Sequence, residues 1–221
     1  MLRWISLLMA ACFLGACHSP MNIKPPAQWV ASSPAPMAMS LAPQQPQDRD
    51  ATMRVIICYS PLISSHACLL MDGPGSQRLF WDPGGTFGQD KAPYVRQGDV
   101  LLDDSALNLQ ELWQYRRVGC NEPHVLVFEW KITAMQAQHR RAILTRHARD
   151  EKGSVLFDAD APGGQCSVYM SAFLRRFCEE TSKQVGDCFW PHNLAKQLWQ
   201  CQPDRVMLIR RPDEVTLYTR E

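Results

Sequence analysis

The chain has 221 residues, of which 46% are hydrophobic, and a formal net charge of +1 at pH 7. This length and hydrophobic content suffice for one sizeable domain with a real core, or for two small ones. Because the charge is near neutral and Lys and Arg are scattered along the chain, we expect no nucleic-acid partner.

The first residues have the pattern of an export signal. A basic Arg3 precedes an apolar run of 13 residues from Trp4 to Ala16, which is shorter than the roughly 20 residues of a membrane-spanning helix. The string "LGAC" at 14–17 resembles the lipobox of bacterial lipoproteins, and this resemblance implies a signal peptide of residues 1–16, cleaved before Cys17, and lipidation of the Cys17 thiol. His at the next position, rather than Asp, implies the outer membrane. The alternative is an ordinary signal peptide with a chance cysteine.

Residues 17–52 have the composition of a tether. Pro, Ala, Ser, Met and Gln are frequent in this stretch, and its apolar residues have no regular period. We expect the lipid on Cys17 to hold the protein at the membrane, since each buried methylene contributes roughly 0.8 kcal/mol. The tether then leads to a domain of residues 53–221.

The first part of this domain is predicted to consist of short strands. Each predicted strand is a short apolar run bounded by turn residues: 53–60, 66–71 and 77–82. If "GPG" at 73–75 forms a three-residue hairpin loop, His66 lies directly opposite Asp82.

The rest of the domain mixes helices with further strands. Helices are predicted from helical spacing of apolar residues, from a capping box formed by Thr133 and Gln136, and from a proline in the first turn of the last helix: 107–118, 134–152, 166–177 and 191–199. Further strands are predicted at 124–132, 205–211 and 215–220. This mixed order, with two hairpins, predicts an α+β fold whose antiparallel sheet packs against helices.

Cys166 is the candidate nucleophile. It follows Gly163 and Gly164 and opens a predicted helix, where unpaired backbone N–H groups and the helix dipole both favour a thiolate. Such a placement can lower a cysteine pKa from about 8.5 into the range of roughly 3.5 to 7.5. The alternative is that Cys166 is half of a disulfide.

His66 and Asp82 complete the candidate site. His66 starts a strand, and Asp82 on the next strand would hold the imidazole tautomer that faces the thiol. Taken alone, His66 could be satisfied by backbone groups and Asp82 could cap its own turn. Tyr59 is a further candidate, whose hydroxyl would join the backbone N–H of Cys166 in holding an oxyanion. No metal or cofactor is expected, because the other histidines lack paired ligand spacing.

The cysteine count leaves disulfide pairing open. Nine cysteines less Cys12 in the signal and the lipidated Cys17 leave seven, an odd number. An oxidising periplasm would allow up to three bridges and one free thiol. We expect Cys178 to pair with Cys188 or Cys201, because these residues flank a turn and the next helix.

Five strings of this sequence carry a family resemblance: "SSHACLLMDG", "FWDPGG", "ITAMQAQHRRAIL", "GGQCSVYMSAFL" and "FWPHNLAKQLW". Together they resemble the circularly permuted papain-like enzymes of the YaeF/YiiX type, which are relatives of NlpC-type peptidases and of lecithin retinol acyltransferase. The resemblance implies a permuted papain-like fold in which His66 is the base, Asp82 its orienting partner and Cys166 the nucleophile, followed by Ser167. Several members of the family are bacterial lipoproteins.

These observations predict a thiol hydrolase on the periplasmic face of the outer membrane. We expect it to cleave an amide, ester or thioester, with the peptide stems of peptidoglycan or a lipid acyl group as substrate. One alternative is a catalytically inactive lipoprotein that binds cell-wall or lipid ligands in the same groove. The other is a thiol acyltransferase that uses an acceptor other than water.

Overall fold

The computed structural model describes residues 25–32, 50–59, 66–74, 78–83, 94–96, 99–102, 109–117, 124–149, 166–188 and 190–220. The strands are β1 (Trp29–Ala31), β2 (Asp50–Tyr59), β3 (His66–Asp72), β4 (Arg78–Asp82), β5 (Tyr94–Arg96), β6 (Asp99–Leu102), β7 (His124–Thr133), β8 (Arg205–Arg211) and β9 (Glu214–Arg220). The helices are α3 (Leu109–Arg117), α4 (Ala134–Arg149), α5 (Cys166–Phe177) and α6 (Pro191–Leu198), followed by the 3-10 turn η3 (Trp199–Cys201).

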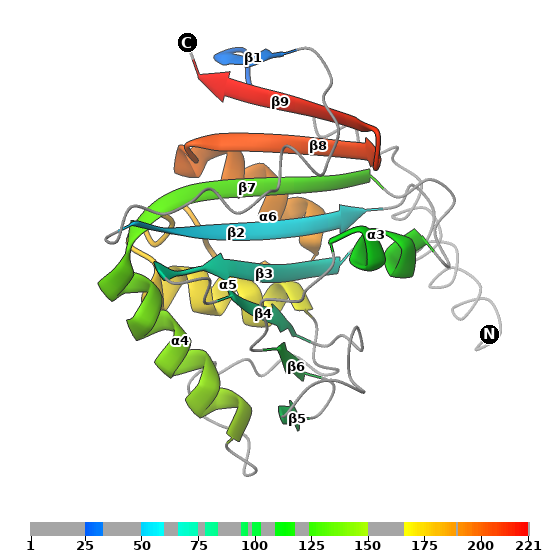
Figure 1. Ribbon diagram of the computed structural model, residues 1–221. Helices are drawn as coiled ribbons and strands as arrows, with labels where there is room; N and C mark the ends of the chain where they lie inside the picture. Colours follow the sequence, from blue (N-terminus) through cyan, green and yellow to red (C-terminus); the bar gives the residue numbers. More distant parts are fainter. Residues whose placement is uncertain are drawn as a thin grey trace, which may run out of the picture.

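The described strands form one sheet in the order β1-β9-β8-β7-β2-β3-β4-β6-β5. Each pairing between them is antiparallel. Helices α4, α5 and α6 lie on one face of this sheet and α3 lies on the other (Figure 1). The predicted α+β class with an antiparallel sheet is therefore confirmed.

Side chains of the central strands alternate between two hydrophobic clusters. On β2, Val55 and Ile57 belong to the larger cluster under α4, α5 and α6, whereas Ile56 and Cys58 belong to the smaller cluster under α3. Successive residues of a strand point to opposite faces of the sheet, so a strand that is covered on both faces is apolar throughout. This explains the apolar run from Val55 to Cys58 in β2, which has no polar residue on either face.

The helix signals in the sequence have the expected structural roles. Gln136 N–H donates to the Thr133 hydroxyl over 3.2 Å, and Thr133 N–H donates to the Gln136 side-chain oxygen over 2.8 Å, which completes the predicted capping box. Pro191 occupies the first turn of α6, and Leu194 and Leu198 are fully buried. These local predictions are confirmed.

Strand β1 lies within the stretch whose composition suggested a tether. It pairs with β9, and its Trp29 is buried with its ring edge-to-face against Trp199, at a centroid distance of 5.2 Å. Strand β2 also begins at Asp50, before the expected domain start at residue 53. The three residues of β1 are too few to form a strand pattern that the sequence reveals. The strand is stabilised by pairing at the sheet edge and by the aromatic contact of Trp29.

The hairpin between β3 and β4 differs from the prediction in its register. Asp72 pairs with Arg78, so residues 73–77 connect the strands and the expected three-residue loop is wrong. The observed register shifts the pairing by two residues, so His66 and Asp82 are not directly opposite. Because side chains alternate with a period of two, a shift of two residues leaves both side chains on the same face of the hairpin.

Five charged side chains form a chain of ion pairs across five neighbouring strands, which we call the charge ladder. In sheet order they are Arg205, Glu129, Arg54, Asp72 and Arg78, so that the signs alternate. Arg54 Nε lies 2.7 Å from a Glu129 oxygen, and these two residues are only 1% and 2% exposed. Each buried charge thus has a neighbour of opposite charge, which offsets the cost of removing it from water.

Cys178, Cys188 and Cys201 have free thiols, so the predicted pairing of Cys178 with Cys188 or Cys201 is wrong. The Cys178 sulfur lies 3.7 Å from the Met53 sulfur, and the Cys201 thiol donates to the Gln197 carbonyl over 3.3 Å. Each of these thiols therefore packs with another partner in the core. Cys120 lies outside the described residues.

Candidate active site

Cys166 is the first residue of α5, and it is half-buried. The helix packs on the sheet through Met170 and Phe173, which belong to the same hydrophobic cluster as Ala67 and Leu69 of β3. The apolar side of α5 thereby holds Cys166 at the end of the helix where backbone N–H groups lack intrahelical partners. The sequence prediction of a helix that starts at this cysteine is confirmed.

His66 and Asp82 are joined by a hydrogen bond between the imidazole Nε2 and a carboxylate oxygen. His66 opens β3 and Asp82 closes β4. His66 is 8% exposed and Asp82 is completely buried. The predicted contact between these two side chains is confirmed, although the register that brings them together differs.

The Cys166 thiol is hydrogen-bonded to the same imidazole. Because Nε2 is bonded to Asp82, Nδ1 is the ring nitrogen that is left for the sulfur. Asp82, His66 and Cys166 therefore form one continuous chain of hydrogen bonds from a buried carboxylate to a half-buried sulfur. The structure brings together the three residues that the sequence singled out.

The electrostatics of this chain favour a thiolate–imidazolium pair. Burial lowers the pKa of His66, but the hydrogen bonds to Asp82 and Cys166 and the negative charge of these groups outweigh it and raise the pKa to about 9. Burial raises the pKa of Cys166, but the hydrogen bond and the positive charge of His66 outweigh it and hold this pKa below its ordinary value. At neutral pH His66 is therefore charged, and the thiolate of Cys166 forms at a lower pH than that of an ordinary cysteine.

A backbone group that the sequence analysis missed also contacts the sulfur. The N–H of Ala67 forms a hydrogen bond with Cys166 and helps to lower its pKa. Ala67 directly follows His66 on β3. Since this donor belongs to the main chain, no residue type in the sequence could have indicated it.

The other thiols with shifted pKa values differ from Cys166 in the direction of the shift. Burial raises the pKa of Cys178 to about 12, that of Cys188 to about 11 and that of Cys201 to about 12. The thiolate is the reactive form of cysteine, so these three side chains are inert at neutral pH. Cys166 is accordingly the thiol best prepared for nucleophilic attack among them.

Aromatic side chains pack between β4, α4 and α5. Trp81, the neighbour of Asp82, packs edge-to-face on Phe173 of α5 at a centroid distance of 5.5 Å. The His147 ring is buried, 6.3 Å from Trp81 and 6.4 Å from Tyr169. His147 thus packs among these aromatic rings.

Several predicted site residues lie outside the described part of the chain. These are the lipidation site Cys17 and the loop residues Gly163 and Gly164, together with the side chain of Tyr59. Among the described residues no group of three or more His, Cys, Asp and Glu side chains could hold a metal ion. In this same part of the chain, no helix combines the length and apolar character needed to cross a membrane.

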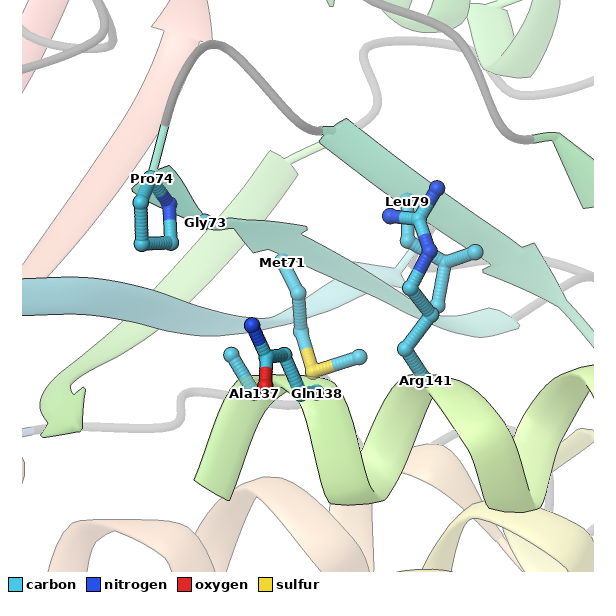
Figure 2. Close-up of a pocket in the computed structure, with 7 residues that line it drawn as sticks. All are labelled: Met71, Gly73, Pro74, Leu79, Ala137, Gln138 and Arg141. Atoms are coloured by element: carbon cyan, nitrogen blue, oxygen red, sulfur yellow. The ribbon is translucent and has the colours of Figure 1, made fainter. Parts of the chain in front are cut away.

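A shallow hollow lies between α4 and the β3–β4 hairpin. Figure 2 shows Met71 and Leu79 of the hairpin above the helix, with Arg141 reaching up from α4. Met71 lies near the end of β3, whereas His66 is its first residue. The hollow is therefore separate from the Cys166 site.

Comparisons with models of known families, with curated proteins and with solved structures find no match to this chain. What can be said of its function therefore rests on the chemistry of the residues themselves.

Proposed function

We propose that this protein is a cysteine hydrolase that cleaves an amide or ester bond, with Cys166 as nucleophile, His66 as general base and acid, and Asp82 as the residue that positions His66. The observation that carries this proposal is the single chain of hydrogen bonds from Asp82 through His66 to Cys166. Its two pKa shifts are those that a thiol nucleophile with an imidazole partner requires.

The reaction begins from the thiolate–imidazolium pair. The sulfur of Cys166 attacks the substrate carbonyl carbon, and the oxygen that becomes negative accepts hydrogen bonds from backbone N–H groups at the start of α5. The His66 imidazolium gives its proton to the leaving amine or alcohol as the carbon–heteroatom bond breaks, which leaves a thioester on Cys166. Neutral His66 then takes a proton from water, the resulting hydroxide attacks the thioester, and the free acid leaves.

Asp82 acts on this cycle through His66. Its buried carboxylate accepts a hydrogen bond from Nε2–H, which directs Nδ1 to the sulfur and stabilises the imidazolium in both half-reactions. Burial strengthens this interaction because little water screens it.

We further propose a permuted papain-like fold for the domain and an outer-membrane lipoprotein for the whole chain. The chain order His, acid, Cys and the antiparallel sheet packed against the helix that carries the cysteine support the first. The string "LGAC" at 14–17 supports the second. Peptidoglycan stem peptides or lipid acyl groups are then the substrates within reach.

Alkylation of the unreduced full-length protein tests the nucleophile. We expect iodoacetamide to modify Cys166 first and rapidly at pH 7, as mapped by intact mass and peptide mass spectrometry, and expect His66→Ala to slow this by at least about tenfold. The matched control is His139→Ala, which removes an exposed histidine of α4. An unreactive Cys166, or a rate that is the same in His66→Ala, would contradict the proposal and favour a binding protein.

Trapping of the acyl group tests the reaction. Incubation with p-nitrophenyl acetate should release p-nitrophenol in a burst and add one acetyl group to Cys166, and none to Cys166→Ala. Decay of this acetyl-enzyme in water identifies a hydrolase, whereas decay only after an added amine or alcohol acceptor identifies an acyltransferase.

A further inference from the structure

The chain between α5 and α6 runs back along α5 toward its first residue. After the end of α5 the Asp187 carboxylate forms an ion pair with Arg175 over 2.7 Å, and one residue later Cys188 N–H donates to the Ser171 hydroxyl over 3.2 Å. The contacts thus move from the last turn of α5 to its second turn as the chain advances. Gly186 N–H also donates to the Gln197 side chain over 2.8 Å, so the segment starts beside the last turn of α6.

This course leads Trp190 toward the first turn of α5. Trp190 has extended backbone angles, φ −114° and ψ 134°, and lies two residues beyond Cys188. Gly186 contacts the last turn of α6 and Asp187 the last turn of α5, so the two helices end near each other, and the seven residues from Gln197 back to Trp190 rise about 10 Å at about 1.5 Å each. The same distance counted back along α5 from Arg175 ends in its first turn, which Cys166 opens.

Trp190 is 47% exposed, although it is one of the largest apolar side chains. The only other large apolar side chains exposed among the described residues are Val30 on β1 and Met135 on α4. Trp190 is therefore the one of these three that the course of the chain puts beside the nucleophile.

The other side of the Trp190 ring is supported by His192. The two rings are stacked, with centroids 6.4 Å apart and planes inclined by 22°. Burial and the charge of Lys196 lower the pKa of His192, so its ring is neutral at pH 7. Pro191 between them fixes the backbone at the start of α6. Such an aromatic surface is held in place before any ligand arrives, which reduces the entropy that binding costs.

We propose that the exposed face of Trp190 binds an apolar group of the substrate next to the carbonyl that Cys166 attacks. This inference rests on the proposed function and narrows its substrate class to amides or esters that carry a hydrocarbon group near the scissile bond. Either a fatty acyl chain or a large apolar amino-acid side chain has this chemistry. Contact with Trp190 removes apolar surface of both partners from water, which favours such substrates over small polar ones.

The test compares three alkylating reagents on the full-length protein: iodoacetamide, N-hexyl iodoacetamide and N-phenyl iodoacetamide. The measured quantity is the rate of Cys166 modification by each apolar reagent relative to iodoacetamide, divided by the same ratio for free cysteine. We expect this preference to exceed one in the natural chain and to fall about five- to tenfold in Trp190→Ala, because roughly 50 Å² of apolar contact is lost. A larger preference for hexyl indicates fatty acyl substrates, and a larger preference for phenyl indicates an aromatic side chain.

Two further variants separate a lost surface from a damaged fold. Trp190→Phe keeps an aromatic face and should keep most of the preference, and Met135→Ala removes another exposed apolar side chain and should leave it unchanged. An unchanged preference in Trp190→Ala overturns this inference. The proposed function fails on a different readout, namely an iodoacetamide rate at Cys166 that does not depend on His66.

Discussion

His66 and Asp82 form a hydrogen bond across two antiparallel strands although neither residue lies directly opposite the other. The observed register, continued from the pair Leu69 and Trp81, sets Asp82 beside Cys68, two residues along β3 from His66. Diagonal neighbours of this kind are about 7–8 Å apart at Cα and share a face of the sheet, within reach of an imidazole and a carboxylate. A register that differs by two residues from the predicted one therefore still allows this contact. A register that differed by one residue would put the two side chains on opposite faces of the sheet.

The pH dependence of the reaction should follow the two shifted pKa values of the site. The Cys166 thiolate forms at a lower pH than an ordinary thiol, so alkylation should already be fast at pH values where free cysteine reacts slowly. Above pH of about 9 His66 loses its proton, so hydrolysis should decline because no acid protonates the leaving group, whereas alkylation should continue. Stopped-flow alkylation and steady-state hydrolysis between pH 5 and 10 measure the two profiles. Coincident profiles above pH 9 would contradict this assignment of roles.

Asp82→Asn should lower hydrolysis by about 10²–10⁴-fold, because the amide of Asn cannot balance the charge of the imidazolium. The side chains have nearly the same size, so we expect the far-UV circular dichroism and thermal unfolding to change little. Loss of the carboxylate also lowers the pKa of His66, which moves the alkaline decline of hydrolysis to lower pH. Asp213→Asn, at an exposed position between β8 and β9, is the control. It should leave both the rate of hydrolysis and its alkaline decline unchanged. If the alkaline decline of Asp82→Asn stays in place, Asp82 does not position His66.

The charge ladder should contribute to stability through its buried members. Glu129→Gln leaves Arg54 and Arg205 without the carboxylate that pairs with both, and we expect this to lower the free energy of unfolding by about 3–5 kcal/mol. The matched control is Glu214→Gln, which removes the same charge from an exposed pair with Arg210 and should cost below about 1 kcal/mol. Urea unfolding measures both, and similar costs for the two variants would mean that burial does not strengthen the ladder.

The capping box before α4 gives a prediction about local stability. Thr133→Ala removes the hydroxyl that accepts from Gln136 N–H, and its expected cost is about 1 kcal/mol. Since Thr133 is exposed, no loss of core packing adds to this value. Gln136→Ala removes the reciprocal hydrogen bond, and the double variant should cost less than the sum of the single variants because the two bonds form one unit. Strict additivity in thermal or urea unfolding would show that the bonds act independently.

Features that depend on a few neighbouring residues could be predicted from the sequence. The capping box, the proline that starts α6 and the start of α5 at Cys166 each follow from backbone groups within one helical turn. The strand pattern of β2, β3, β4, β7, β8 and β9 follows in the same way from short apolar runs between turn residues. The three site residues were also found in this way, since each one starts or ends such an element.

Features that join distant segments were decided by the tertiary structure. The edge strand β1, the free thiols of Cys178 and Cys201 and the five-strand charge ladder depend on which surfaces meet after the sheet has formed. The same holds for the backbone N–H of Ala67 at the sulfur and for the place of Trp190 beside α5. By itself, then, the sequence determined which residues could react and where the helices and strands begin. Strand pairing and helix packing decided which of these side chains touch, because contacts between residues far apart in the chain depend on which strands pair and which faces meet, and short stretches of sequence encode neither.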